Sequence, residues 1–199
     1  MHVRVITFTG AKNINEGVAY VRDKVIENLN EQRGYRGLTV SADRPGEVLG
    51  ILTLWETEED RDASERALAN SRQKGLEIIG GSMSVENFEQ LVGKIIEPPV
   101  AGSPLTVTPI TMNPSKVDEN LAYFKSDVLP QIIATAGCRA VRNMMNRQTG
   151  HGIVGVVWED KDAMTAAAAA AASRREGAVA RGVNFGEVSI REIVLANIR

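Results

Sequence analysis

The sequence predicts an α+β protein in which two ferredoxin-like βαββαβ units are fused in one chain of 199 residues. Three observations lead to this fold class. An internal repeat relates the two halves, the same order of strands and helices is predicted in each half, and a proline-rich segment separates them. The predicted domains are 1–97 and 105–199, with the linker 98–104 between them.

The repeat rests on five residues that return at one offset, since 158 − 55 = 103 and 123 − 20 = 103. Five coincidences at one spacing indicate a duplicated fold. The offset falls to 102 in the second helix of the unit, which a single-residue gap explains. The first-half members are Tyr20, Gly34, Arg36, Trp55 and Glu56, and their counterparts are Tyr123, Gly137, Arg139, Trp158 and Glu159.

The first unit opens with a β-branched run over 3–9, which predicts a strand. Asn13 and Glu16 have the spacing of a capping box and begin a helix that ends at Gly34. A hairpin, a second helix capped by Thr57 and a final strand follow. Their ranges are 35–42 and 48–55 for the hairpin, 57 to about 74 for the helix, and 83–92 for the strand.

The second unit repeats this order. A strand over 105–112 precedes a helix in which Pro130 predicts a kink, because proline removes one backbone hydrogen bond. Strands over 138–146 and 152–158 form the hairpin. Asp160 then caps a helix that contains seven consecutive alanines, Ala166–Ala172, and alanine is the strongest helix former.

A four-stranded sheet with both helices on one face leaves its other face bare, and the strands predict apolar residues on both faces. A second copy of the unit can cover that face, and burial stabilises by about 25 cal/mol per Å². We therefore expect the two units to form a pseudo-dimeric α/β barrel.

Composition narrows the function classes. The net charge of −2 gives no indication of a nucleic-acid partner. Cys138 is the only cysteine, so no internal disulfide can form, and we expect a buried, inert thiol. Neither a signal peptide nor an apolar run of membrane-spanning length is evident, so we expect a cytoplasmic protein without membrane contact. A homo-oligomer of the fused pair is left open.

With Trp-Glu after each hairpin and the segments LPQIIATAGCRAV and GVVWEDKDAM in the second half, the chain resembles the dimeric α/β-barrel superfamily. The nearest branch is the antibiotic-biosynthesis-monooxygenase group. That resemblance implies a cofactor-independent monooxygenase that acts on a small aromatic or polyketide-like molecule. The alternative is a non-catalytic small-molecule-binding or assembly protein of the same fold.

No cofactor is expected. Heme-degrading relatives use a tryptophan and a histidine on the helix after Trp-Glu, and this chain has neither residue there. No His, Cys and carboxylate cluster has metal-ligand spacing, so no metal site is predicted. His151 stands in or beside a predicted hairpin turn, where a solvent-exposed ring is the expectation.

Six residues are candidates for ligand binding, although no catalytic residue can be assigned. The two tryptophans could form an aromatic wall, and an arginine could hold a carboxylate or phenolate. Arg142 and Asn143 alternate along a strand, so one of them should face an interior that requires a polar partner. The candidates are Trp55, Trp158, Arg36, Arg139, Arg142 and Asn143.

Plainer interpretations compete with each of these. The tryptophans also fit core positions that seat the second helix on the sheet, and Arg36 and Arg139 also fit salt bridges. Arg72 and Arg174, in the repeated Ser-Arg pair, could line an opening at the helix end, but solvated side chains are the simpler expectation. Polar residues differ between the halves, which favours the second half as the place for a site.

Overall fold

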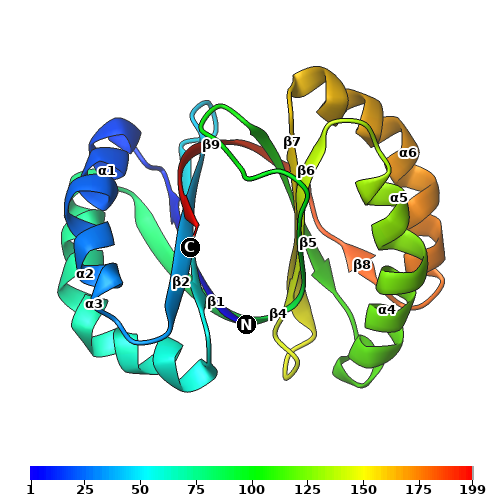
Figure 1. Ribbon diagram of the computed structural model, residues 1–199, viewed down its shortest axis with the longest axis horizontal. Coiled ribbons are helices and arrows are strands. Elements are labelled where there is room, and N and C mark those ends of the chain that lie inside the picture. The colour runs from blue at the N-terminus through cyan, green and yellow to red at the C-terminus, as the bar shows by residue number, and fades with distance from the viewer. Residues whose placement is uncertain (199) are drawn as a thin grey trace. The chain divides into compact units, whose positions relative to one another are not determined.

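The computed structural model describes residues 1–198 and divides the chain into two compact units (Figure 1). The first unit contains Met1–Asn87 and the final segment from Glu192 onward. The second unit is Phe88–Arg191. The α+β class with ferredoxin-like units is confirmed. The predicted boundaries at 97 and 105 follow the sequence repeat, and as domain limits they stay a prediction.

In the first unit the strand order is β4-β1-β3-β2-β9, and two helical segments cover one face of the sheet (Figure 1). The strands pair antiparallel in the β1–β3, β2–β3 and β2–β9 ladders. Its elements are β1 (His2–Thr9), α1 (Ile14–Tyr20), η1 (Val21–Val25), α2 (Ile26–Asn30), β2 (Tyr35–Asp43), β3 (Val48–Trp55), α3 (Glu58–Ile79) and the first part of β4 (Ser82–Ile95).

The second unit has the order β4-β6-β7-β5-β9 and again carries its helices on one face of the sheet (Figure 1). The long strands β4 and β9 each contribute a part to both units. The elements are β5 (Pro104–Thr111), η2 (Pro114–Lys116), α4 (Val117–Tyr123), η3 (Phe124–Val128), α5 (Leu129–Ile133), β6 (Cys138–Met145), β7 (His151–Trp158), α6 (Lys161–Val179), β8 (Asn184–Phe185) and β9 (Ser189–Ile198).

The first helix of each unit contains a π-helical turn, η1 in one and η3 in the other. Pro130 follows η3 at the start of α5, but Glu27 occupies the corresponding place after η1. Because both helices have the turn and only one has a proline, the irregularity belongs to the shared fold. The π-helical turn therefore does not depend on a proline, and a kink caused by Pro130 stays a prediction.

The second helix of each unit begins at a side-chain cap, as predicted. Thr57 accepts a hydrogen bond from the Asp60 amide at 3.1 Å, and Asp160 accepts one from the Ala163 amide at 2.8 Å. The predicted capping box at Asn13 does not form, because the Asn13 amide group donates to the carbonyl of Ile78 instead. That bond ties the start of α1 to the end of α3.

A glycine ends the first helical segment in each unit with a left-handed backbone, at φ 70° for Gly34 and 76° for Gly137. A Cβ atom on Gly34 would lie 2.7 Å from that of Asp60, and one on Gly137 would lie 2.5 Å from that of Ala163. The glycines thus allow the second helix to approach the turn closely, which explains why the repeat keeps them.

Candidate functional site

The second unit contains a cavity of about 630 Å³ between its sheet and its helices. The strands β5, β6 and β7 supply the sheet side, and α4, η3, α5 and α6 supply the helix side. Most lining side chains are aliphatic or aromatic, among them Phe124, Val156 and Trp158. A cavity of this size falls within the range of small-molecule sites, about 300–1,000 Å³.

The alanine run explains the helix side of this cavity. Ala167, Ala168, Ala171 and Ala172 all line it, at the spacing of one helix face. In the first unit the sheet-facing side of α3 carries Leu68, which is buried in the core. The cavity-facing side of α6 carries methyl groups only at these four positions, so the volume that a larger side chain would occupy stays open.

The sheet side is also smaller in the second unit. Arg4 pairs with Thr53 in the β1–β3 ladder, and Thr106 pairs with Val156 in the β5–β7 ladder. Since Thr53 and Val156 are one repeat apart (156 − 53 = 103), Thr106 occupies the place of Arg4. Thr106 lines the cavity with a short side chain where the first unit has a long one.

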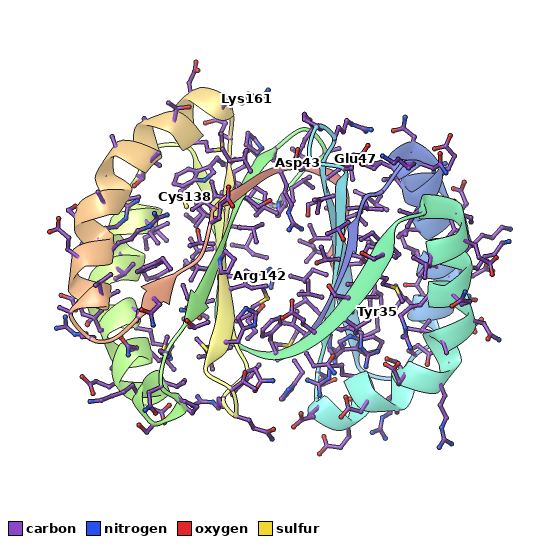
Figure 2. The ribbon with its side chains drawn as sticks, turned by 180° about the vertical axis from the view of Figure 1, so that it is seen from behind. Tyr35, Asp43, Glu47, Cys138, Arg142 and Lys161 are labelled. Atoms are coloured by element: carbon purple, nitrogen blue, oxygen red, sulfur yellow. The ribbon has the colours of Figure 1, made fainter. Side chains whose placement is uncertain are left out.

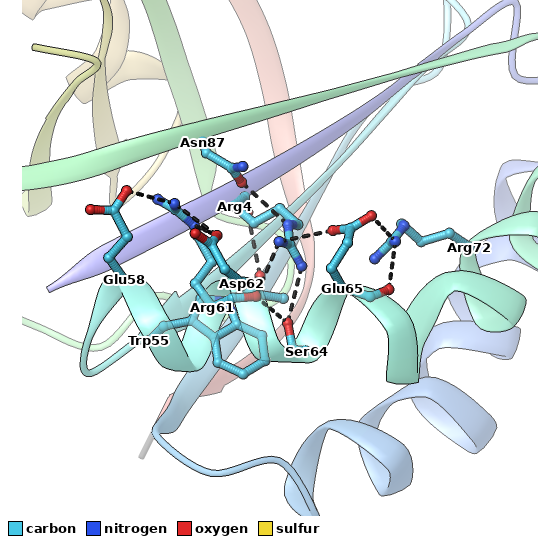
Figure 3. Close-up of polar contacts among 10 residues, drawn as sticks. Arg4, Trp55, Glu58, Arg61, Asp62, Ser64, Glu65, Arg72 and Asn87 are labelled. Atoms are coloured by element: carbon cyan, nitrogen blue, oxygen red, sulfur yellow. Dashed lines mark hydrogen bonds and ion pairs between the residues drawn. The ribbon is translucent and has the colours of Figure 1, made fainter. Parts of the chain in front are cut away.

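In the first unit Arg4 fills this space with a polar network (Figure 3). Its side chain is 3% exposed and forms an ion pair with Glu65 at 2.9 Å. It also donates to the Ser64 hydroxyl at 3.0 Å and to the Arg61 carbonyl at 3.1 Å. Burial lowers the pKa of Arg4, and Glu65 opposes that shift. The corresponding space in this unit is only about 50 Å³.

Asn143 places an unsatisfied amide at the cavity. It is 5% exposed and lines the cavity, and its Oδ1 atom has no hydrogen-bond partner within the described chain. Asn143 pairs with Val154 as Val40 pairs with Ile51, so it replaces a fully buried valine of the first unit. A buried polar atom without a partner is costly unless something binds it.

Trp158 also lines the cavity, and it is 3% exposed. Its indole Nε1 donates to the Thr106 hydroxyl at 3.3 Å. In the first unit the Trp55 indole donates instead to Thr53 at 3.0 Å, and its ring meets Tyr35 edge-on at 5.7 Å between centroids. Both tryptophans therefore lie in cores, but only Trp158 faces open volume.

Arg174 and Arg175 on α6 are half-buried lining residues. Arg174 donates to the Ala167 carbonyl at 3.2 Å, and Arg175 lies over the Phe185 ring at 5.3 Å from its centroid. Burial lowers the pKa of Arg174, and the charge of Arg175 lowers it further. The expectation of a solvated Arg174 is wrong, as it is for Arg72, whose side chain is 11% exposed.

Four of the six candidates lie outside the cavity lining, namely Trp55, Arg36, Arg139 and Arg142. Arg36 forms an ion pair with Glu56, and Arg139 forms ion pairs with Glu97 at 3.2 Å and Glu159 at 3.9 Å. A ligand-binding role for these two arginines stays a prediction, while their guanidinium groups already contact protein carboxylates.

Arg142 lies on β6, the strand that begins at Cys138 (Figure 2). Arg142 does not line the cavity, although its neighbour Asn143 does, as expected from the alternation of side chains along a strand. It donates to the Gln90 side chain, and burial lowers its pKa to about 10. Of the six candidates, the structure therefore brings Trp158 and Asn143 together at the cavity.

Other reactive groups lie elsewhere. Burial raises the pKa of the Cys138 thiol to about 11. The His151 ring lies half-buried at 5.8 Å from the Phe88 ring, between centroids, and does not line the cavity. Within residues 1–198 no group of three or more His, Cys, Asp or Glu side chains is arranged to hold a metal ion.

Solved structures share this architecture over nearly the whole chain. An anthrone oxidase-like protein matches with a TM-score of 0.67 and 16% identity, covering 99% of this chain and 93% of its own. A protein named as a putative monooxygenase from Fusobacterium nucleatum matches with a TM-score of 0.72 and 11% identity, covering 100% of this chain and 94% of its own. A ferredoxin fold protein from Listeria monocytogenes, related to antibiotic biosynthesis monooxygenases, matches with a TM-score of 0.55 and 11% identity. The match covers 96% of this chain and 94% of that protein.

The chain has the fold of the antibiotic-biosynthesis-monooxygenase-like proteins. No family model matches the sequence. Two uncharacterized proteins of Mycobacterium tuberculosis are similar to it. One is 29% identical over 151 residues, which are 76% of this chain and 67% of that protein. The other is 24% identical over 189 residues, which are 94% and 80%.

Sequence reasoning missed most of the cavity. It singled out Trp158, Asn143 and Arg174, but not Thr106, Arg175 or the alanine face. One signal was available, because the second helix of the second half carries seven consecutive alanines and the corresponding helix of the first half carries larger residues such as Leu68.

None of the helices formed by residues 1–198 is both long and apolar enough to cross a membrane.

Proposed function

We propose that the chain is a cofactor-independent monooxygenase-like protein that binds a small aromatic or polyketide-like molecule in its second unit. The observation that carries this proposal is the apolar cavity of about 630 Å³, with the unpartnered Asn143 amide at its wall. Mostly apolar cavities with a few polar groups are the usual form of small-molecule sites. The names of two matched structures, an anthrone oxidase-like protein and a putative monooxygenase, support oxygen chemistry.

The reaction considered is the oxidation of an activated methylene by dioxygen. The substrate anion reacts with O₂, one oxygen atom becomes the new carbonyl oxygen, and the other leaves as water with the two methylene hydrogens. The cavity would keep bulk water from the anion and hold it in one orientation. Asn143 is placed to hydrogen-bond a polar group of the bound molecule, since no protein group among the described residues does so.

Binding without turnover is the second candidate, and one observation favours it. The described residues that line the cavity include no histidine, aspartate or glutamate, so no carboxylate or imidazole is present there to remove a proton. The lining groups that titrate are Tyr123, Arg174 and Arg175. A substrate that ionises readily in water would not need such a base, whereas a less acidic molecule would only bind.

Oxygen uptake with anthrone tests the first candidate. We expect the purified protein to consume about one O₂ per anthrone, as the reaction's stoichiometry requires, above the rate without protein. Ala171→Leu should reduce uptake about 10-fold or more, because the added side chain projects into the cavity and obstructs the bound molecule. Ala170→Leu, on the exposed side of the same helix, is the matched control and should keep the wild-type rate.

Binding is measured in parallel by the quenching of Trp158 fluorescence, with Trp158→Phe to separate it from Trp55. Quenching that is lost in Ala171→Leu and kept in Ala170→Leu, together with no oxygen uptake, would favour binding without turnover. If neither oxygen uptake nor quenching occurs with the wild-type protein, both candidates fail.

A further inference from the structure

Arg174 and Arg175 line the cavity without a carboxylate. Neither forms an ion pair with an Asp or Glu among the described residues, and the charge that acts on the pKa of Arg174 is that of Arg175. Two adjacent cations that are half-buried repel each other, and burial weakens the solvation that would otherwise compensate. An arrangement of this kind is stabilised when an anion binds.

The first unit neutralises the corresponding arginine internally. Arg72 forms an ion pair with Glu65, seven positions earlier on α3, and also donates to the Glu65 carbonyl at 2.9 Å (Figure 3). Arg174 donates in the same manner to the carbonyl seven positions earlier. The residues seven positions before Arg174 and Arg175 are Ala167 and Ala168. The second unit therefore keeps the cations and lacks the acid.

The same two alanines line the cavity. The change that removes the internal acid thus also opens space in front of the arginines, so both parts of a binding site arise from one helix face. On the sheet side Asn143 is 5% exposed, and its Oδ1 atom adds a hydrogen-bond acceptor that has no partner among the described residues. The lining between them is apolar, with Phe124, Val128 and Val156 as examples.

We propose that the cavity binds an amphipathic carboxylate, with its apolar body among the aliphatic and aromatic side chains and its carboxylate on Arg174 and Arg175. A hydroxyl or N–H group of the same molecule would donate to Asn143. This inference rests on the proposed binding role of the cavity and adds the charge of the ligand. Arginine suits a carboxylate because its planar guanidinium can donate two parallel hydrogen bonds.

A matched pair of probes tests the charge requirement. Anthracene-9-carboxylate and 9-anthracenemethanol have similar shapes, but only the first carries a negative charge. We expect the carboxylate to bind about 10-fold or more tightly than the alcohol, as for hydrogen bonds to charged groups. The preference should shrink as salt is added, because both guanidinium groups are partly accessible to solvent. Calorimetry or fluorescence titration gives both dissociation constants.

Four variants test whether the preference comes from the arginines. The double variant Arg174→Gln/Arg175→Gln should remove the preference, so that the carboxylate and the alcohol bind with similar dissociation constants. Ala168→Glu should act in the same direction, because it places an acid seven positions before Arg175, at the spacing of Glu65 and Arg72 in the first unit. The double variant Lys125→Gln/Lys161→Gln removes two exposed positive charges from the same unit and should keep the preference. Arg174→Lys/Arg175→Lys should retain part of it.

The outcomes separate this inference from the proposed function. If both probes bind equally well and Ala171→Leu abolishes their binding, the cavity is a ligand site but the carboxylate inference is wrong. If neither probe binds, the proposed function is contradicted as well. A carboxylate preference that persists in Arg174→Gln/Arg175→Gln, with circular dichroism showing a folded protein, would also overturn the assignment.

Discussion

The two units have the same order of strands and helices but different interiors. The first unit places Arg4, Leu68 and Arg72 between its sheet and α3, with about 50 Å³ left open. The second has Thr106 in the place of Arg4, Arg174 in the place of Arg72 and a face of alanines on α6, with about 630 Å³ open. Because the hydrogen-bonded backbone is common to both, side-chain volume alone decides whether this fold is a filled core or a container.

The difference teaches how a duplicated fold can divide its tasks. Open volume costs stability, since each missing side chain takes its packing contacts with it. The first unit retains these contacts and the Arg4 network, whereas the second unit lacks both. We therefore expect the first unit to be the more stable of the two, and the second to gain stability from a ligand.

The largest expected effect on stability comes from exchanging leucine and alanine on the interior faces of α3 and α6. Leu68→Ala should destabilise the protein by about 2–5 kcal/mol, because it creates a cavity in a filled core. Ala171→Leu should change the free energy of unfolding by less than about 1.5 kcal/mol, or increase it, because the space is already open. Urea unfolding, followed by far-ultraviolet circular dichroism, measures both.

Equal losses from these two substitutions would contradict the comparison, since they would show that the second unit has no room for a larger side chain. Ala170→Leu controls for helix propensity, because it lies on the exposed side of α6.

A smaller effect is expected from Arg4→Thr, which gives the first unit the residue that the second unit has. The Ser64 hydroxyl and the Arg61 carbonyl would lose the hydrogen bonds that Arg4 donates to them, although Ser64 would still donate to Arg61, so we expect a loss of roughly 1–3 kcal/mol. Glu65→Ala should cost less than about 1 kcal/mol, because the Glu65 side chain is 53% exposed and its ion pairs with Arg4 and Arg72 are screened.

If Glu65→Ala proved as costly as Arg4→Thr, the ion pair rather than the buried hydrogen bonds would hold Arg4. Chemical unfolding of both variants and of the double variant separates the two contributions.

A further difference between the units lies at the start of the second strand, where the first unit has Tyr35 and the second has Cys138. We expect the reactivity of the Cys138 thiol, and its effect on stability, to depend on pH. Burial raises the pKa of the thiol to about 11, so the folded protein holds its proton at pH 8 and forms little thiolate. Reaction with a disulfide reagent at pH 8 should be slow in the folded protein and fast in urea. Because the folded-state pKa lies above that of a free thiol, ionisation disfavours the folded state as pH rises toward 11.

Rapid labelling of Cys138 without denaturant would contradict its burial, provided that circular dichroism shows a folded protein. Cys138→Ser removes the labelled group and serves as the control.

The smallest effect is expected from Pro130→Ala. The first unit has the same π-helical turn with Glu27 in place of the proline, so the turn does not depend on it. Helix content should be unchanged and the melting temperature should move by no more than a few degrees, consistent with about 1 kcal/mol or less. A large gain in helix content would restore the proline as the cause of the turn.

The fold could be predicted because its signals are local and repeated. The periodic apolar residues, the end glycines Gly34 and Gly137 and the caps Thr57 and Asp160 act over a few residues, and the repeat gives each signal twice. The Asn13 side chain does not form the predicted cap, because it donates a hydrogen bond to the backbone carbonyl of Ile78, which is far away in the sequence.

The cavity could be predicted only in part, because a void depends on side chains from several elements. Asn143 was recognisable as a polar residue in an apolar strand, and its place opposite Val154 confirms that it faces the interior of the unit. The alanine run predicts a helix equally well with or without a cavity beside it. No sequence pattern marks Arg175 as a cavity residue. That no carboxylate pairs with it stands out only in comparison with the Arg72–Glu65 ion pair of the first unit.

The strand β9 pairs with β2, and its residues from Glu192 onward belong to the first unit. During synthesis β2 is therefore an open sheet edge until the last residues of β9 have left the ribosome, although everything else in its unit is already made. Open edges invite pairing with other chains. A chain whose synthesis stops before residue 192 would leave that edge exposed permanently. The first unit therefore has a protected edge only in chains in which the second unit has also been synthesised.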